Sequence, residues 1–163
     1  MRLCLDDFRA LEVPFDRIFD SVERGEAEPG LVIHEGQLTY TARGFTKLLD
    51  LGVWWHEKTG LPLPLGANAI RKDLGEPLCL EVSRLLRASI DYGLAHREEA
   101  LRYAMEFGRG MDSALADDFV GMYVNEDTRA WNPESRRGLE QLLNMAWEHG
   151  LTTKRVHPEF LPS

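Results

Sequence analysis

Residues 30–40 read Gly30-Leu31-Val32-Ile33-His34-Glu35-Gly36-Gln37-Leu38-Thr39-Tyr40, and this stretch decides the fold that the sequence predicts. Residues 31–33 form a continuous run of apolar residues that favour strands. A strand of a parallel sheet is covered on both faces, so it is apolar at every position and not only at every second one. The run therefore predicts a buried strand that ends at His34.

One helix is expected before this strand and two further strands after it. Apolar residues recur with helical spacing between Pro14, which opens the helix, and Gly25, which ends it. Residues 47–51 and 66–70 are the two strand candidates. The small side chains of residues 66–69 would let the backbone approach a ligand or another strand closely.

The remainder of the chain has the pattern of helices. Apolar residues between Leu78 and Ile90 form a helical stripe, and residues 53–59 and 97–107 predict two more helical segments. Asp112 can cap a helix that runs to about residue 123. Asn132, which a proline follows, begins the last predicted helix, and this helix ends at Gly150.

These elements define an α/β fold class that is incomplete and helix-rich toward the C-terminus. A strand that is apolar on both faces needs neighbouring strands and covering helices. All the strand candidates precede residue 72, so part of the sheet is expected to lie outside this chain.

Composition restricts the classes of partner. The 163 residues carry a net charge of −8, which disfavours nucleic acid and anionic membranes because both need a basic surface. The two cysteines have no metal-ligand spacing and are read as small apolar residues. The first seven residues lack the apolar region of a secretory signal, so the cytoplasm is the expected location.

The polar residues that follow the first predicted strand are the best candidates for chemistry. Ligands of open α/β sheets bind beyond the carboxyl ends of strands, and an imidazole with its ordinary pKa of about 6.5 can act as a base near neutral pH. His34 is therefore the candidate base, and Glu35 would orient it or bind substrate. The competing interpretation is that His34 is simply a hydrogen-bonded histidine at a strand end.

Other sites have weaker signals. His96 and His149 fall at predicted helix ends, where a cation suits the helix dipole. The histidines form no HExxH motif or Cys/His ligand set, so a metal site is not expected. Neither a phosphate-binding loop nor a serine elbow occurs. Trp54 and Trp55 are interpreted as packing residues.

Several motifs together resemble the menaquinone-biosynthesis family of 1,4-dihydroxy-6-naphthoate synthases and related substrate-binding-like proteins. The resemblance covers almost the whole chain, and its most specific parts are residues 34–40 and 59–66. The motifs are, in chain order, Val13-Pro14-Phe15-Asp16-Arg17-Ile18, the stretch 30–40 quoted above, Asp50-Leu51-Gly52, Trp54-Trp55, Thr59-Gly60-Leu61-Pro62-Leu63-Pro64-Leu65-Gly66, Asn68-Ala69-Ile70-Arg71-Lys72-Asp73-Leu74-Gly75 and Met122-Tyr123-Val124-Asn125.

The resemblance implies a fold like that of type II periplasmic binding proteins, with two lobes and a cleft. Residues 1–65 would form most of the second lobe, and residues 66–163 the crossing strand and the helical end of the first. The implied activity is a lyase that converts cyclic de-hypoxanthine futalosine to 1,4-dihydroxy-6-naphthoate without a cofactor. The implied base is His34, and Glu35, Gly66 and Asn68 are the expected substrate-binding residues.

Departures from the family pattern lead to further expectations. The family's Ser-Pro-Cys-Pro-Asn-Asp-like segment is absent, so the chain is expected to be a fragment. Alone it is expected to be inactive. Exposed apolar surface is expected to favour self-association as a homodimer. Two alternatives to the enzyme remain. One is a solute-binding protein of the same fold, and the other is a remnant without catalysis.

Overall fold

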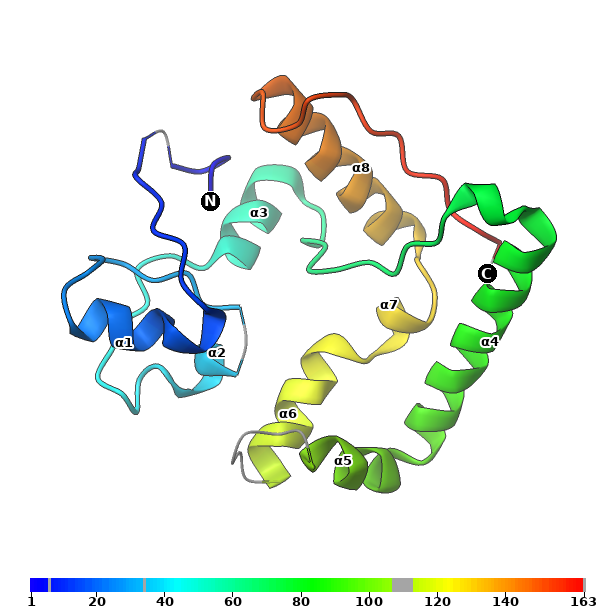
Figure 1. Ribbon diagram of the computed structural model, residues 1–163, viewed down its shortest axis with the longest axis horizontal. Coiled ribbons are helices and arrows are strands. Elements are labelled where there is room, and N and C mark those ends of the chain that lie inside the picture. The colour runs from blue at the N-terminus through cyan, green and yellow to red at the C-terminus, as the bar shows by residue number, and fades with distance from the viewer. Residues whose placement is uncertain (6, 34, 107–112, 163) are drawn as a thin grey trace. The chain divides into compact units, whose positions relative to one another are not determined.

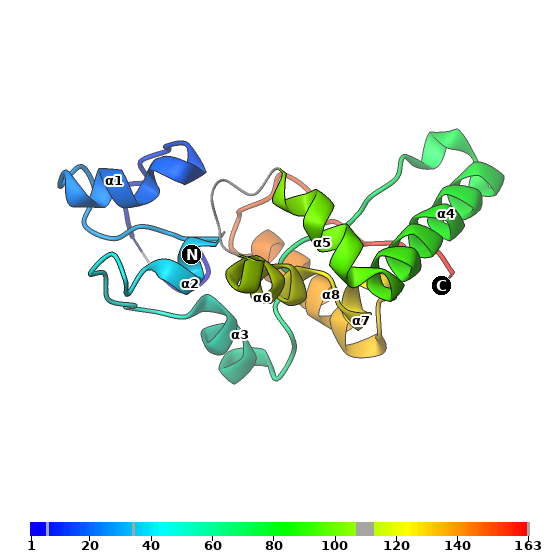
Figure 2. The ribbon, with the colours of Figure 1, turned by 90° about the horizontal axis from the view of Figure 1, so that it is seen from below.

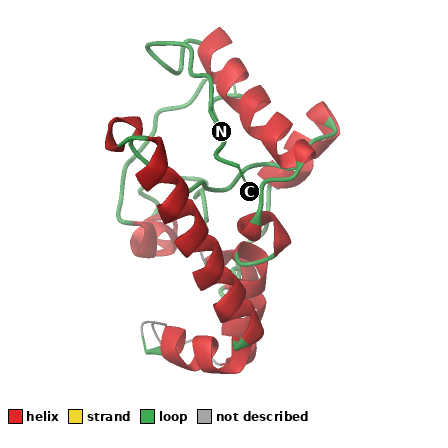
Figure 3. Ribbon diagram, turned by 90° about the vertical axis from the view of Figure 1, so that its right-hand side faces the viewer, coloured by secondary structure: helices red, strands yellow, loops and turns green. Residues whose placement is uncertain are grey.

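The computed structural model describes residues 1–5, 7–33, 35–106 and 113–162 (Figure 1). By internal contacts the chain divides into two compact units, Met1–Asp50 and Leu51–Ser163. Every regular element among the described residues is a helix, as the colouring of Figure 3 shows. The predicted enrichment in helix toward the C-terminus is confirmed.

The first unit is built around one short helix. A single turn, η1 (Phe15–Arg17), leads into α1 (Ile18–Glu23), and α2 (Gly36–Thr39) follows later. Phe19 of α1 is buried and stacks on Phe45 with ring centroids 4.9 Å apart. Gly25 ends the helix at a φ of 71°, a left-handed conformation that favours glycine. The predicted helix from Pro14 to Gly25 is confirmed.

The second unit contains the longer helices. They are α3 (Leu51–Thr59), the turn η2 (Lys72–Leu74), α4 (Glu76–Ala95), α5 (Arg97–Met105), α6 (Ser113–Tyr123), α7 (Glu126–Arg129) and α8 (Pro133–Glu148). Helices α4, α5 and α6 pack in sequence, and α7 returns to α4 (Figure 2). The Nε atom of Arg97 in α5 donates to Asp117 of α6 at 2.8 Å, and Arg129 of α7 pairs with Asp91 of α4.

Trp55 is the centre of packing in this unit. Its side chain is fully buried, and its indole N–H donates to the carbonyl oxygen of Pro62 at 3.1 Å. A Cβ atom added at Gly138 of α8 would lie 2.5 Å from the same oxygen. Helix α3, the extended segment that follows it and α8 therefore meet at Pro62. The predicted packing role of Trp55 is confirmed.

The three predicted strands are wrong. Residues 31–33 and 66–70 have no regular secondary structure, and residues 47–50 have none before α3 begins at Leu51. A strand exists only when a neighbour accepts and donates its backbone hydrogen bonds. No backbone–backbone hydrogen bond involves residues 63–70 within the described part of the chain. The apolar runs therefore have the composition of strands but no partner strand among the described residues.

Most of the helix predictions are confirmed. Helices are found over most of residues 76–95, 97–105 and 133–148, and Asn132 caps the last of these as expected. The last residue of the helical segment predicted at 97–107, and the predicted cap at Asp112, lie outside the described residues. Helices α2 and α7 were not predicted, because a helix of four residues is too short to show the helical spacing of apolar residues in its sequence.

Candidate functional site

His34, the candidate base, lies outside the described residues. Glu35, which follows it, is half-buried and stands at the N-cap of α2. Its carbonyl oxygen accepts hydrogen bonds from the N–H of Leu38 at 3.0 Å and from the hydroxyl of Thr39 at 3.5 Å. The Thr39 hydroxyl, expected to bind a ligand, is thus engaged by the backbone of its own helical turn.

Gly36 begins the helical turn α2. Its φ is not positive, and the residue is buried. Its carbonyl oxygen accepts a hydrogen bond from the N–H of Tyr40 at 2.9 Å. Within this short helix Gln37 is half-buried, as is Tyr40 at its C-cap.

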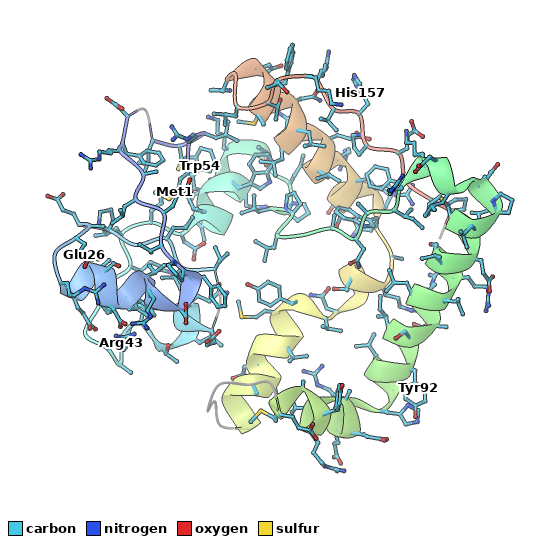
Figure 4. All side chains as sticks on the ribbon, in the orientation of Figure 1. Met1, Glu26, Arg43, Trp54, Tyr92 and His157 are labelled. Carbon is cyan, nitrogen blue, oxygen red and sulfur yellow. The ribbon has the colours of Figure 1, made fainter. Side chains whose placement is uncertain are left out.

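Arg43 fixes the segment after α2 against α1. Its guanidinium donates to Asp20 at 3.2 Å and to Glu23 at 2.9 Å, and it lies 4.7 Å from the ring centroid of Phe19 (Figure 4). The hydrogen bond to Asp20 is the main cause that raises the pKa of Arg43. The cation is a fixed structural group of this unit.

A cavity of about 360 Å³ lies in the second unit. One wall is the extended segment 62–68, which includes the predicted substrate-binding residues Gly66 and Asn68. The other wall comes from the end of α6, from α7 and from the start of α8. Among the side chains that the structure describes, those lining the cavity are apolar, aromatic, amide or hydroxyl groups.

The aromatic and hydroxyl side chains of this cavity were missed as site residues. Tyr123, Trp131 and Ser135 line it, and Trp131 and Ser135 come from segments with no sequence signal for binding. The motif Met122-Tyr123-Val124-Asn125 was the one available pointer, since Met122, Tyr123 and Asn125 line the cavity.

Asn125 also has a structural role. Its backbone N–H donates to the hydroxyl of Thr128 at 3.4 Å, and its side-chain oxygen accepts from the Thr128 N–H at 3.4 Å. The Thr128 hydroxyl in turn donates to the carbonyl oxygen of Tyr123. This reciprocal cap begins α7 and holds the turn that shapes the cavity.

The predicted site residues fall in both units. Gly66 and Asn68 line the cavity of the second unit, and Glu35 belongs to the first unit. Among the residues with described positions, no three His, Cys, Asp or Glu side chains gather as a metal site would require. His96 and His149 stand at the C-caps of α4 and α8, and each Nδ1 contacts the carbonyl oxygen four residues earlier, as expected for helix ends.

Comparisons with known proteins converge on one family. Residues 1–148 match the family described as "Menaquinone biosynthesis". The chain is 39% identical over 161 residues to a 1,4-dihydroxy-6-naphthoate synthase of Thermus thermophilus, and 39% identical over 139 residues to one of Streptomyces coelicolor. These matches cover 99% and 85% of this chain but 59% and 49% of the two relatives, so the chain spans about half their length.

A solved structure agrees with these relatives. The crystal structure of protein AF1704 from Archaeoglobus fulgidus is similar with a TM-score of 0.89 at 43% identity. The similarity covers 93% of this chain and 57% of that one. Among the helices described, none has the length and apolar character that crossing a membrane requires.

Proposed function

The chain belongs to the menaquinone biosynthesis family, and from this we propose that it carries part of a lyase that forms 1,4-dihydroxy-6-naphthoate. The observation that carries the proposal is the 39% identity to the Thermus thermophilus synthase over 161 residues. Because the chain spans 59% of that relative, the proposed activity belongs to the complete family fold. In that fold two α/β lobes enclose a cleft, and this chain contributes one part of it.

His34 is the proposed base. The proposed substrate is cyclic de-hypoxanthine futalosine, and its cleavage to an aromatic naphthoate is an elimination. His34 takes a proton from carbon, the electron pair of that C–H bond becomes part of the new double bond, and the leaving group departs with the electron pair of the bond that breaks. The step needs no oxidant or reductant, because an elimination is redox-neutral overall.

Gly66 and Asn68 are proposed to bind the substrate from the extended segment. A Cβ atom added at Gly66 would meet nothing within 4 Å, so this position leaves open space beside the cavity. The Asn68 amide can both donate and accept hydrogen bonds. The amide and hydroxyl groups of the described lining can form hydrogen bonds with a hydroxyl-bearing ring system. Glu35 is proposed to orient His34 or to contact substrate.

A pair of histidine variants tests the proposed base. The chain is first completed with the part of the Thermus thermophilus synthase that it does not span. Losing a general base should lower kcat by about 10²-fold or more, so naphthoate formation should fall to that extent in His34→Ala. His157→Ala is the matched control, because His157 is exposed in the C-terminal tail, and it should keep the parental rate.

The same assay separates the lyase from a binding protein of the same fold. If the substrate binds tightly but neither the parent nor His34→Ala converts it, the proposal of a lyase gives way to that of a solute-binding protein. Equal naphthoate formation by the parent and His34→Ala would support the lyase activity and show that His34 is not its base.

A further inference from the structure

The C-terminal tail, residues 151–162, packs back on the second unit. It lies beyond the residues that match the family, and it contains no helix or strand. Figure 1 shows it running alongside α8 toward η2 and the start of α4. The Nε atom of Arg155 donates to the side-chain oxygen of Asn144 in α8 at 3.1 Å, and Glu159 pairs with Lys72 of η2. The tail therefore joins two elements that are far apart in the sequence.

Phe160 makes the ring contacts of this tail. The residue is half-buried, and its ring centroid lies 5.6 Å from that of Trp131, with the two ring planes tilted by 54°. The guanidinium carbon of Arg136 lies 4.9 Å from the centroid of the Phe160 ring. Both arrangements are favourable, because the faces of aromatic rings attract ring edges and cations. The Nε atom of Arg136 also donates to the carbonyl oxygen of Trp131 at 3.1 Å, so the three residues form one cluster.

Trp131 belongs both to this cluster and to the wall of the cavity. It stands directly before Asn132, the cap of α8, and is itself outside any helix. A side chain at a binding site keeps one orientation when neighbouring side chains pack against it. Phe160 is not among the described residues that line the cavity, so it would act on a ligand only through Trp131.

Ring packing is the contact that should hold the tail in place. The side chains of Lys72 and Glu159 are each 72% exposed, and an ion pair in water contributes little to stability. Arg155 is exposed as well. The contact of Phe160 with Trp131 buries apolar surface and is not screened by salt. Removal of the Phe160 ring should therefore release Trp131 more than removal of either charged contact.

We propose that the C-terminal tail is a strap that holds Trp131 as an aromatic wall of the cavity, with Phe160 as the positioning residue. The ligand is a planar aromatic ring that carries hydroxyl groups. An indole packs against such a ring, and the described lining also offers amide and hydroxyl groups for hydrogen bonds. This role of Trp131 rests on the proposed function, in which the ring is that of the naphthoate.

Fluorine NMR of the full chain tests whether Trp131 contacts the ring. Labelling with 5-fluorotryptophan gives one signal for each of the four tryptophans, and Trp131→Phe identifies the signal of Trp131 by its loss. The proposed product, 1,4-dihydroxy-6-naphthoate, is then titrated into the parent. The Trp131 signal should move more than the other three. A parent that binds no naphthoate, or that binds it without moving this signal, overturns the proposal.

Variants of the tail test the positioning role. Phe160→Ala should shift the Trp131 signal without ligand and weaken naphthoate binding by about threefold or more, the size expected for one aromatic contact. Phe160→Tyr keeps the ring and should bind like the parent. Val156→Ala is the matched control, because Val156 is an exposed apolar residue of the same tail, and it should change neither the signal nor the affinity. Equal weakening by Phe160→Ala and Val156→Ala would overturn the strap.

Failure of the strap and failure of the proposed function give different results. If the parent binds naphthoate at Trp131 and Phe160→Ala binds it equally well, the strap is wrong and the proposed lyase is unaffected. If the completed chain forms no naphthoate, the lyase is wrong, whereas weaker naphthoate binding by Phe160→Ala with rescue by Phe160→Tyr would still support the strap.

Discussion

Gly138 shows how a single residue sets the distance between α8 and the segment after α3. Alanine in a helix interior is usually more favourable than glycine by roughly 0.8–1.0 kcal/mol. At Gly138 the added Cβ would lie 2.5 Å from the carbonyl oxygen of Pro62, and backbone cannot yield as a flexible side chain can. We expect Gly138→Ala to lower the free energy of unfolding by about 1–3 kcal/mol, measured by urea denaturation.

Gly93 provides the matched control. It lies in α4, and a Cβ atom added there would meet nothing within 4 Å. Gly93→Ala should therefore raise the free energy of unfolding by up to about 1 kcal/mol. If the two variants change stability in the same direction, packing at Pro62 is not what selects glycine at position 138.

Sequence predicted part of the candidate site and could not predict the rest. Gly66 and Asn68, the predicted substrate-binding residues, line the cavity of the second unit, and their role in binding stays a prediction. Trp131 and Ser135 join them only through the packing of α8, which no local pattern encodes. The catalytic role of His34 stays a prediction.

At the scale of elements, the N-terminus of α8 is fixed by its cap. The side-chain oxygen of Asn132 accepts hydrogen bonds from the N–H groups of Glu134 at 2.9 Å and Ser135 at 2.8 Å. Asn132→Ala leaves both donors without this partner and should cost about 1 kcal/mol of unfolding free energy. Asn132→Asp keeps the acceptor and adds a charge that the helix dipole favours, so it should be at least as stable as the parent.

Thermal denaturation followed by tryptophan fluorescence measures this difference, since Trp147 lies in α8. Equal melting temperatures for Asn132→Ala and Asn132→Asp would show that the two hydrogen bonds contribute nothing to the stability of α8.

Helices were predictable and strands were not, for a physical reason. A helix satisfies its backbone within its own sequence, so the proline, asparagine and glycine signals around residues 132–150 were sufficient. A strand depends on hydrogen bonds to a distant segment. The apolar runs at residues 31–33 and 66–70 have the composition of strands, but their described surroundings supply no partner strand.

At the scale of the whole molecule, the division into two units predicts that the chain does not unfold in one step. The four tryptophans, at positions 54, 55, 131 and 147, all lie in the second unit. Tryptophan fluorescence therefore reports on that unit alone, whereas far-ultraviolet circular dichroism reports on the helices of both. Two probes give coincident transitions only if unfolding is all-or-none.

Phe19→Ala makes this test specific, because Phe19 is buried in the first unit against Phe45. Removing its ring should destabilise that unit by about 3–5 kcal/mol. We expect an earlier urea transition in circular dichroism while the tryptophan transition stays in place. A shift of both transitions by the same amount would mean that the two units unfold together. The energetic effect of a change at Phe19 would then extend to Trp55 and the cavity, and the stability of the candidate site would depend on the first unit.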